Sequence, residues 1–376
     1  MSTPIRTALI GAGVMGRHHL ELLSRNRDFE VAGVADATAS VRDSLQSCGH
    51  RVFADHREML DSVRPDAVIV ATPNAHHVPV ATECIRRDIA VLIEKPVSDS
   101  LASALEFEAL VAQSGVPVLV GHHRRHNPLL KRAAEHIASG EIGHIVAVVG
   151  LWLRRKPDAY FQDRWKQQAA QGGGVLLINT IHDIDCLRML CGEIASIDAA
   201  TSSRTRALEV EDTAAVTVTF ANGAVGTLTV SDATVAPWCW EMAAQEDVRF
   251  ATLPEDCYLV CGTRGSVAVP TLEHWTNEPN ADRDAPFTRR RLYYVPADAL
   301  TEQIAHFARV VRGEEKPLVD VGSATRTLAA TLAIREAASR QRRVHIADLL
   351  AQSKGDGLAT LMAVSDRATN LGARGT

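Results

Sequence analysis

A glycine-rich turn near the amino terminus constrains the fold of this 376-residue chain more than any other feature. The apolar segment "TALIG" runs into Gly11, Gly13 and Gly16, which fit the pattern G-x-G-x-x-G, and Asp36 follows 20 residues after the last glycine. The pattern alone is weak, but here it follows a predicted strand and opens a predicted helix. This setting predicts a βαβ unit that binds a dinucleotide.

The residues of this turn have distinct expected roles. Gly11 permits the tight turn, Gly13 lets the backbone approach a pyrophosphate, and Gly16 lets helix and strand pack closely. Val14 and Met15 stand at the start of the helix, where unpaired N–H groups and a partial positive charge attract phosphates. We therefore expect these five residues to contact the cofactor.

Asp36 predicts which dinucleotide is bound. It ends the second predicted strand, where a carboxylate can accept hydrogen bonds from both hydroxyls of a ribose. The same negative charge would repel a 2′-phosphate. The expected cofactor is therefore NAD rather than NADP.

Up to about residue 123, apolar strand candidates alternate with helical stretches. Near-continuous apolar strands in such an alternation indicate a parallel sheet with helices on both faces. We therefore predict a doubly wound, Rossmann-type domain over residues 1–125. Its strand candidates are "TALIGAG", "EVAGVAD", "RVFAD", "DAVIVATP", "AVLIEKP" and "VPVLVGHH".

The pattern changes at Asn127-Pro128, where Asn suits a helix N-cap and Pro the first helical turn. Later strand candidates are joined by Asn222-Gly223, a strong hairpin signal, and by Arg264-Gly265, a weaker one. Consecutive hairpins predict a mostly antiparallel sheet in an α+β domain over residues 126–350. Residues 351–376 have little periodicity, and we expect a poorly ordered tail or one that docks on a partner subunit.

Two loops leave strand ends in the first domain, at the edge where an open α/β sheet binds its ligand. Lys95 precedes Pro96 in the second loop, near the expected nicotinamide, where it could hydrogen-bond a substrate hydroxyl. A solvated loop lysine is the plainer alternative. The loop residues expected to contact the cofactor are Thr72, Asn74, His77, Glu94 and Lys95.

The stretch "GGGVLLINTIHDID" (172–185) places ionisable groups in an apolar, helix-like segment. On an α-helix, Leu177, Ile181 and Ile184 form one stripe, while Asn179, His182 and Asp185 lie opposite. We expect the polar face to line an interdomain cleft, and the glycines to let substrate or nicotinamide approach the backbone. His182 suits proton exchange near neutral pH, although a hydrogen-bonded core histidine remains an alternative.

Upstream, "WLRRKPDAYFQDRWKQQ" combines aromatic and cationic residues. Such groups suit a polyhydroxylated or anionic ligand, and a solvated interdomain loop is equally compatible. The candidate substrate contacts here are Lys156, Tyr160, Arg164 and Trp165.

Composition excludes several classes of partner. A formal net charge of -5 gives no reason to expect nucleic acid or an anionic membrane, and without a membrane-spanning run or a signal-peptide layout we expect a cytoplasmic protein. Seven cysteines without a C-x-x-C pair support neither a disulfide framework nor a zinc cluster. Adjacent histidine pairs point to opposite faces of a strand, so no metal site is predicted.

Taken together and in order, the motifs are similar to those of the Gfo/Idh/MocA family, the relatives of glucose-fructose oxidoreductase and inositol dehydrogenase. The resemblance covers roughly residues 5 to 345. It rests on "GAGVMG", "EKP", "GHHRRHNP", "GGG" followed by "HDID", "PWCWE" and "QIAHFARVVRGEEKPLVD".

The resemblance implies an NAD(P)-dependent oxidation of a secondary alcohol on a sugar, cyclitol or similar polyol, by a homodimer or homotetramer. It implies that Lys95 touches the substrate hydroxyl and the nicotinamide region, that His182 is the acid/base, and that Arg124 borders the cofactor. Many members carry an Asp four residues before the histidine, where this chain has Ile178. Isoleucine can neither favour the protonated form of the histidine ring nor orient it. Lys95 is therefore the principal candidate base, and Asn179 is a neutral neighbour that could hydrogen-bond substrate or ring.

Two other functions stay open at this point. One is hydrolysis of a glycosidic bond through transient use of NAD, as in the hydrolase members of the family. The other is a catalytically silent NAD-binding regulator. Free sugar released without net NADH would identify the first, and NAD binding without turnover would favour the second.

The assignment of Asp36 gives a direct test. Replacing it with alanine, Asp36→Ala, is expected to relax the choice of NAD over NADP, because the charge that repels the 2′-phosphate is removed. Steady-state kinetics with both dinucleotides measure the change. Unchanged discrimination would show that another residue reads the ribose.

Overall fold

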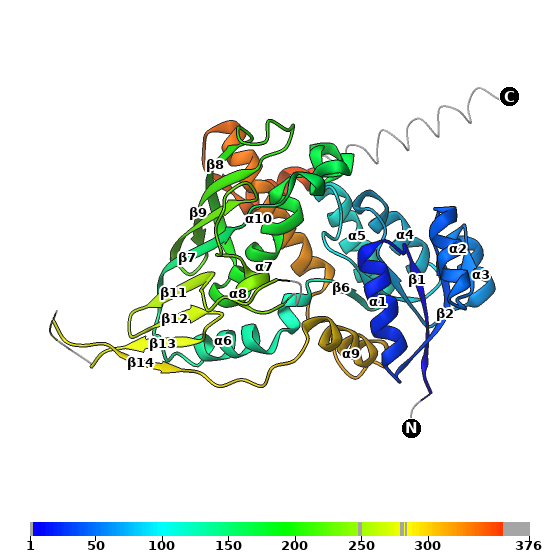
Figure 1. Ribbon diagram of the computed structural model, residues 1–376, viewed down its shortest axis with the longest axis horizontal. Helices are drawn as coiled ribbons and strands as arrows, with labels where there is room; N and C mark the ends of the chain where they lie inside the picture. Colours follow the sequence, from blue (N-terminus) through cyan, green and yellow to red (C-terminus); the bar gives the residue numbers. More distant parts are fainter. Residues whose placement is uncertain (1–2, 247–249, 279–281, 283, 356–376) are drawn as a thin grey trace.

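Two sheets lie side by side with helices packed around and between them (Figure 1). The computed structural model describes residues 3–246, 250–278, 282 and 284–355. One sheet is wholly parallel and the other mostly antiparallel, so the predicted fold class is confirmed.

The parallel sheet has the strand order β3-β2-β1-β4-β5-β6. The order reverses beside β1, which is where an open α/β sheet forms its ligand crevice. Its strands are β1 (Ile5–Ile10), β2 (Phe29–Ala35), β3 (Val52–Phe53), β4 (Ala67–Val70), β5 (Ala90–Ile93) and β6 (Val118–Val120).

Helices connect these strands, and local sequence sets their ends. In the last of them, the Ser100 hydroxyl accepts a hydrogen bond from the backbone N–H of Ser103 at 3.3 Å, and Gly115 closes the helix with φ +71°. The connecting segments are α1 (Val14–Arg25), α2 (Ala39–Ser47), α3 (His56–Val63), η1 (Asn74–His76), α4 (His77–Ile85) and α5 (Leu101–Ser114).

The second sheet has the order β14-β13-β12-β11-β7-β10-β9-β8-β15. Asn222-Gly223 joins the antiparallel pair β9 and β10, and Arg264-Gly265 joins β11 and β12, as predicted; β7 and β10 form a parallel exception. The strands are β7 (Ile145–Leu153), β8 (Ile194–Ser202), β9 (Thr213–Phe220), β10 (Val225–Ser231), β11 (Tyr258–Gly262), β12 (Ser266–Val269), β13 (Glu273–Thr276), β14 (Thr288–Arg291) and β15 (Val344–His345).

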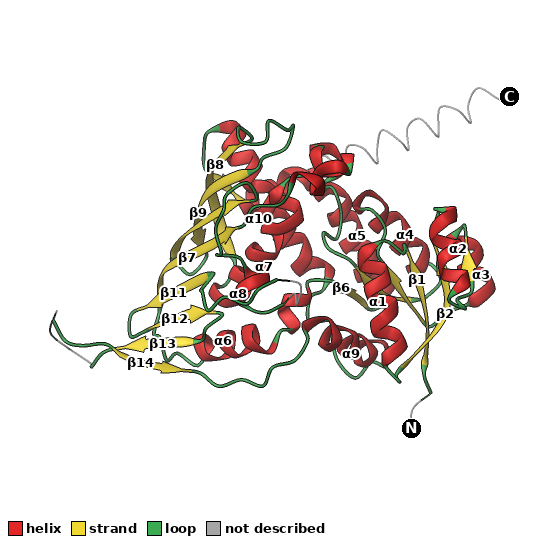
Figure 2. Cartoon of the chain, viewed as in Figure 1, coloured by secondary structure: helices red, strands yellow, loops and turns green. Residues whose placement is uncertain are grey.

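Helices cover one face of this second sheet, on its side towards the first domain (Figure 2). The strand predicted in "RRLYYVP" is correct only at its start, because β14 ends at Arg291. The helices after β6 are η2 (His123–His126), α6 (Pro128–Ala138), α7 (Ile181–Cys191), α8 (Trp240–Ala243), α9 (Ala299–Val311) and α10 (Val321–Arg340), with short helical turns η3 (Asp158–Gln162), η4 (Arg164–Gln167) and η5 (Ala169–Gln171).

The carboxyl-terminal helices do not follow a division at residue 125. On α9, Phe307 is fully buried in the core of the first domain and stacks on Phe29, with ring centroids 6.2 Å apart. On α10, Leu328 belongs to a core of the first domain, whereas Ala333 belongs to the core of the second. Amphipathic patterning predicts that such helices bury a face but not which sheet receives it.

Residues 346–355 are helical, and residues 356–376 of the predicted tail lie outside the described part of the chain. All seven cysteines are free thiols. Among the described helices, none is both long and apolar enough to cross a membrane.

Candidate active site

The glycine turn leaves the start of α1 open to a ligand. No side chain caps α1, and its first turn contains no acidic residue. A Cβ atom on Gly11 or Gly16 would collide with a backbone carbonyl, whereas one on Gly13 would meet nothing within 4 Å. Val14, which follows it, is 83% exposed. Uncapped N–H groups beside an open glycine are what a pyrophosphate requires, so these residues fit a dinucleotide.

Asp36 holds a fixed negative charge at the edge of this turn. Its carboxylate accepts hydrogen bonds from the backbone N–H groups of Ala12 and Thr38, both at 2.8 Å. The guanidinium of Arg42 donates to the backbone carbonyls of Asp36 and Ala37 rather than to the carboxylate. The carboxylate therefore lies where a Rossmann-type domain receives the ribose.

His77 hydrogen-bonds to both loops that were expected to bind the cofactor, the one after β4 and the one after β5. Its ring is buried, with Nδ1 2.7 Å from the carbonyl of Pro96 and Nε2 2.8 Å from the carbonyl of Thr72. The His77 ring therefore joins the two loops, and its contact with the cofactor stays a prediction. Asn74 in the first loop lies against Gly172 of the second domain, where no side chain would fit.

Glu94 likewise has a partner inside the protein. It is buried, and its Oε1 lies 2.7 Å from Nε2 of His19. Burial would raise the pKa of Glu94, but the hydrogen bond and charge of His19 lower the pKa to about 2. Glu94 thus forms a buried pair with His19 next to Lys95, and its contact with the cofactor stays a prediction.

Lys95 reaches from this loop into the second domain. Its Nζ donates a hydrogen bond to the backbone carbonyl of Ile178 at 3.1 Å. Burial lowers the pKa of Lys95, an effect that Glu94 opposes and Arg124 reinforces. The amine is thus placed beside the helix that carries His182 and is more easily deprotonated than a solvated lysine.

The segment that Lys95 contacts is a π-helix, η6 (Leu176–Thr180), which continues into α7. Leu177 packs into the core of the first domain, whereas Ile184 packs into that of the second. The single apolar stripe predicted for an α-helix is therefore wrong, because a π-turn holds more residues and rotates the side chains before it relative to those after it.

His182 is buried, 7% exposed, at the start of α7. Its ring lies edge-on to His123 and His122, at centroid distances of 5.3 and 6.4 Å. Burial, followed by the charges of Lys95 and Arg124, lowers the pKa of His182 well below its usual value. This environment favours the neutral form of the imidazole.

Asp185 does not face the cleft. Its carboxylate accepts two hydrogen bonds from Arg125, at 2.8 and 2.9 Å, and one from Thr327 at 2.9 Å. Burial would raise the pKa of Asp185, but His122 and Arg125 lower the pKa to about 2. Asp185 is therefore a buried anion that joins η2 and α10 to α7, and its contact with the substrate stays a prediction.

The glycines at 172–174 let the chain pack closely against itself. A Cβ atom on Gly173 would meet the backbone carbonyls of Trp165 and Lys166, and one on Gly174 would meet the carboxylate of Glu211. The expected approach of substrate or nicotinamide to this backbone stays a prediction.

Arg124 is also turned inward. Its guanidinium is buried and donates to Glu246 at 3.2 Å, to Glu241 at 3.1 Å and to Asp183 at 3.5 Å. Through these bonds Arg124 links η2 to the second domain, and its place at the border of the cofactor stays a prediction.

The acidic residues that surround Arg124, namely Asp183, Glu241 and Glu246, were not predicted from the sequence. The hydroxyl of Tyr258 donates to Asp183 at 2.5 Å, and burial raises the pKa of Asp183 to about 7. Glu241 lies in the quoted "PWCWE", but its role depends on meeting Arg124, 117 residues away. Nothing local to Tyr258 predicts its contact.

The segment between β7 and η6 brings two of its four predicted substrate residues, Lys156 and Tyr160, to Asn179. The Nζ of Lys156 donates to Oδ1 of Asn179 at 2.5 Å and lies 4.4 Å from the ring centroid of Tyr160. Arg164 and Trp165 lie on the exposed turn η4. The described contacts bring Lys156 and Tyr160 to Asn179, but not Arg164 or Trp165.

One cluster among the described residues has metal-ligand types, namely His136, Glu141 and His274. The guanidinium of Arg290 donates to Glu141 at 2.9 Å and to Nδ1 of His274 at 3.1 Å. The guanidinium of Arg290 therefore already bridges two of the three candidate metal ligands, Glu141 and His274.

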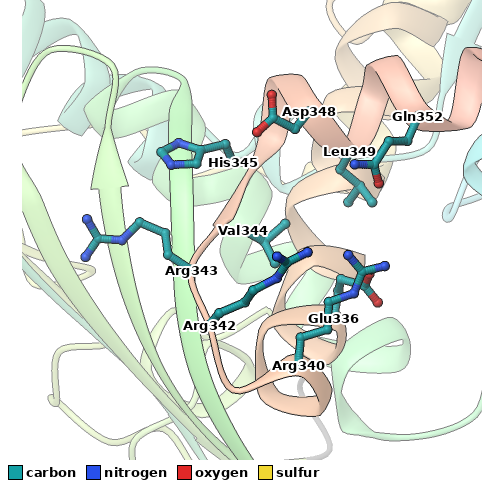
Figure 3. Close-up of a pocket in the computed structure, with 9 residues that line it drawn as sticks. All are labelled: Glu336, Arg340, Arg342, Arg343, Val344, His345, Asp348, Leu349 and Gln352. Carbon is teal, nitrogen blue, oxygen red and sulfur yellow. The ribbon is translucent and has the colours of Figure 1, made fainter.

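A separate hollow lies at the end of α10 (Figure 3). Two of its arginines are already paired, Arg340 with Glu336 and Arg343 with Asp198. None of the predicted site residues lines it. The lining residues are Glu336, Arg340, Arg342, Arg343, Val344, His345, Asp348, Leu349 and Gln352.

The chain belongs to the Gfo/Idh/MocA family of oxidoreductases. The family's NAD-binding Rossmann-fold domain matches residues 5–122, and its C-terminal domain matches residues 130–268. The resemblance predicted from the motifs is thus confirmed, and the first domain is an NAD-binding domain.

Individual relatives cover most of the chain. The uncharacterized oxidoreductase YrbE of Bacillus subtilis is 28% identical over 324 residues, 83% of this chain and 87% of that protein. The scyllo-inositol 2-dehydrogenase (NAD(+)) of the same bacterium is 26% identical, covering 85% and 90%. The WlbA dehydrogenase of Bordetella pertussis, solved with NADH and UDP-GlcNAcA, shares the fold, with a TM-score of 0.74 at 21% identity over 91% of this chain and 99% of that one.

The buried hydrogen bonds of Asp185 predict that replacing its carboxylate lowers the stability of the fold. Asp185→Asn removes the carboxylate from the partly buried Arg125, whose side chain is 14% exposed, and breaking a buried pair costs up to about 3–5 kcal/mol of unfolding free energy. Asp198→Asn, which breaks the exposed pair with Arg343, is the matched control and should cost under about 1 kcal/mol. Urea unfolding measures both. Equal losses, or a stable Asp185→Asn protein without turnover, would contradict the structural role.

Proposed function

We propose that this protein is an NAD-dependent dehydrogenase that oxidises a secondary alcohol of a sugar, cyclitol or related polyol. The observation that carries the proposal is the hydrogen bond from Lys95 to the carbonyl of Ile178, which brings an amine of the NAD-binding domain beside the helix of His182. The similarity to an inositol 2-dehydrogenase over most of the chain supports the substrate class.

The site residues divide the work of this reaction. When bound, the nicotinamide supplies the hydride acceptor. The lowered pKa of Lys95 makes its amine the candidate that takes the proton from the alcohol oxygen. The lowered pKa of His182 favours its neutral ring, which can accept a hydrogen bond from the same hydroxyl. The residues proposed to bind the cofactor are Gly11, Gly13, Val14, Met15, Gly16, Asp36, Thr72 and Asn74, and those proposed at the substrate are Lys95, Asn179 and His182.

The same family analogy predicts a homo-oligomer, and the uncovered face of the second sheet supports it. Leu259 and Val149 are register partners on β11 and β7, and Val149 pairs with Thr227 on β10. Leu259 is 41% and Val149 38% exposed. Leu259 and Val149 form an exposed apolar pair on two central strands, flanked by Thr227 on the third, and such a pair suits burial against a second copy.

Lys95→Ala is expected to lower turnover at least ~100-fold, the usual range for a proton-transfer group. Lys316, which also precedes a proline but lies in an exposed loop, gives the control Lys316→Ala, expected to be near normal. NADH formation over cyclitols, aldoses, uronates and lactones measures both. Near-normal rates in Lys95→Ala would overturn the assignment, and sugar release from an aryl glycoside without net NADH would point to hydrolysis.

The oligomer proposal predicts that Val149→Glu converts the protein to monomers, because a carboxylate in this apolar pair would be buried without a partner. Light scattering at micromolar concentration measures the mass. A monomeric unmodified protein, or an unchanged mass in the variant, would contradict the interface.

A further inference from the structure

Two lysines from different elements bind consecutive residues of the π-helix. Lys95 donates to the backbone carbonyl of Ile178, and Lys156 donates to the side-chain Oδ1 of Asn179. At 2.5 Å, the second is a short, charge-assisted hydrogen bond. The two ammonium groups act on the same turn of the helix.

The position of Lys156 is fixed by its own surroundings. Its backbone N–H donates to the carbonyl of Asp232, and its carbonyl accepts a hydrogen bond from Arg206, both at 2.8 Å. The carboxylate of Asp232 accepts from Arg206 at 2.9 Å, whereas it lies 3.8 Å from Nζ of Lys156. The hydrogen bond of the ammonium is therefore made to Asn179 rather than to the nearest carboxylate.

This bond determines how the amide of Asn179 is turned. Because Oδ1 accepts from a cation that has no lone pair, the reverse amide orientation would set two donors against each other. No described residue accepts a hydrogen bond from Nδ2, and Asn179 is half-buried rather than enclosed. The Nδ2 group is left as a fixed donor next to the residue that Lys95 contacts.

We propose that Lys156 is a positioning residue for the dehydrogenase reaction: it holds the Asn179 amide so that Nδ2 donates a hydrogen bond to an oxygen of the substrate beside Lys95. The proposal rests on the proposed function. It gives Asn179 the role of substrate donor and Lys156 that of its orienting partner, with no contact between Lys156 and the substrate.

The charges around Lys156 make the pair sensitive to pH. Burial lowers the pKa of Lys156 to about 8, against the opposing effects of Asp232 and Glu241, while Arg154 and Lys95 lower it further. The ammonium is therefore present below pH 8 and lost above it. The neutral amine has a lone pair that accepts from Nδ2, so the amide is then free to reverse.

Kinetic pH profiles test the role. We expect kcat/KM of the unmodified enzyme to fall as pH rises through about 8. Asn179→Asp places a carboxylate against Lys156, which raises the pKa of the amine. The fall in kcat/KM, the alkaline limb of the profile, should therefore shift to a pH higher by roughly one unit or more. Lys156→Met should lower kcat/KM at pH 7 by about 10- to 100-fold and abolish the limb.

Lys166 supplies the matched control, because its Nζ lies 3.8 Å from the centroid of the same Tyr160 ring but it has no bond to Asn179. Lys166→Met should keep the profile of the unmodified enzyme. An unmoved limb in Asn179→Asp, or normal kcat/KM in Lys156→Met, would overturn the proposal.

NMR of lysine labelled at 13Cε tests the pair without turnover, with Lys156→Met used for assignment. We expect a Lys156 signal that titrates near pH 8 and moves upward in Asn179→Asp. If the signal behaves so while no alcohol is oxidised, the dehydrogenase function fails and the pair stands. A signal that titrates like a solvated lysine and does not respond to Asn179→Asp would overturn the pair itself.

Discussion

The hydrogen bond between Lys95 and the carbonyl of Ile178 is the contact on which the arrangement of the site depends. It joins a loop at the edge of the parallel sheet to a helix of the second domain. That carbonyl belongs to a π-turn, in which the N–H of Ile181 donates to Leu176, five residues back. The hydrogen bond to Ile178 gives the amine of Lys95 an acceptor inside the protein, without which its burial would be costly.

Features that depend on short stretches of chain were predicted from the sequence. The glycine turn, the cap at Asn127 and the hairpin at Asn222-Gly223 follow from backbone preferences of a few residues. The attachment of α9 to the first domain could not be predicted, because its amphipathic face specifies burial and not a partner. The strand β8, with the polar sequence "IASIDAATS", gave little periodic signal.

The candidate site was predicted in its residue types but not in its orientations. Glu94, Arg124 and Asp185 have the chemistry of ligand contacts, yet each is neutralised by a residue distant in the chain. A sequence shows which groups are ionisable, whereas only the fold shows which of them find a partner. The π-turn changes the direction of the Asn179 and His182 side chains relative to an α-helix. The sequence "LLINT" contains no residue that predicts a π-turn.

The course of α10 has a consequence for motion. Its first half is anchored in the core of the NAD-binding domain through Leu328, and its second half in the core of the other domain through Ala333. Drawing the two domains apart would expose fully buried side chains of this one helix to water. Because α10 contributes to both cores, it holds the two domains together, and motions that keep its buried residues covered are favoured over motions that separate the domains.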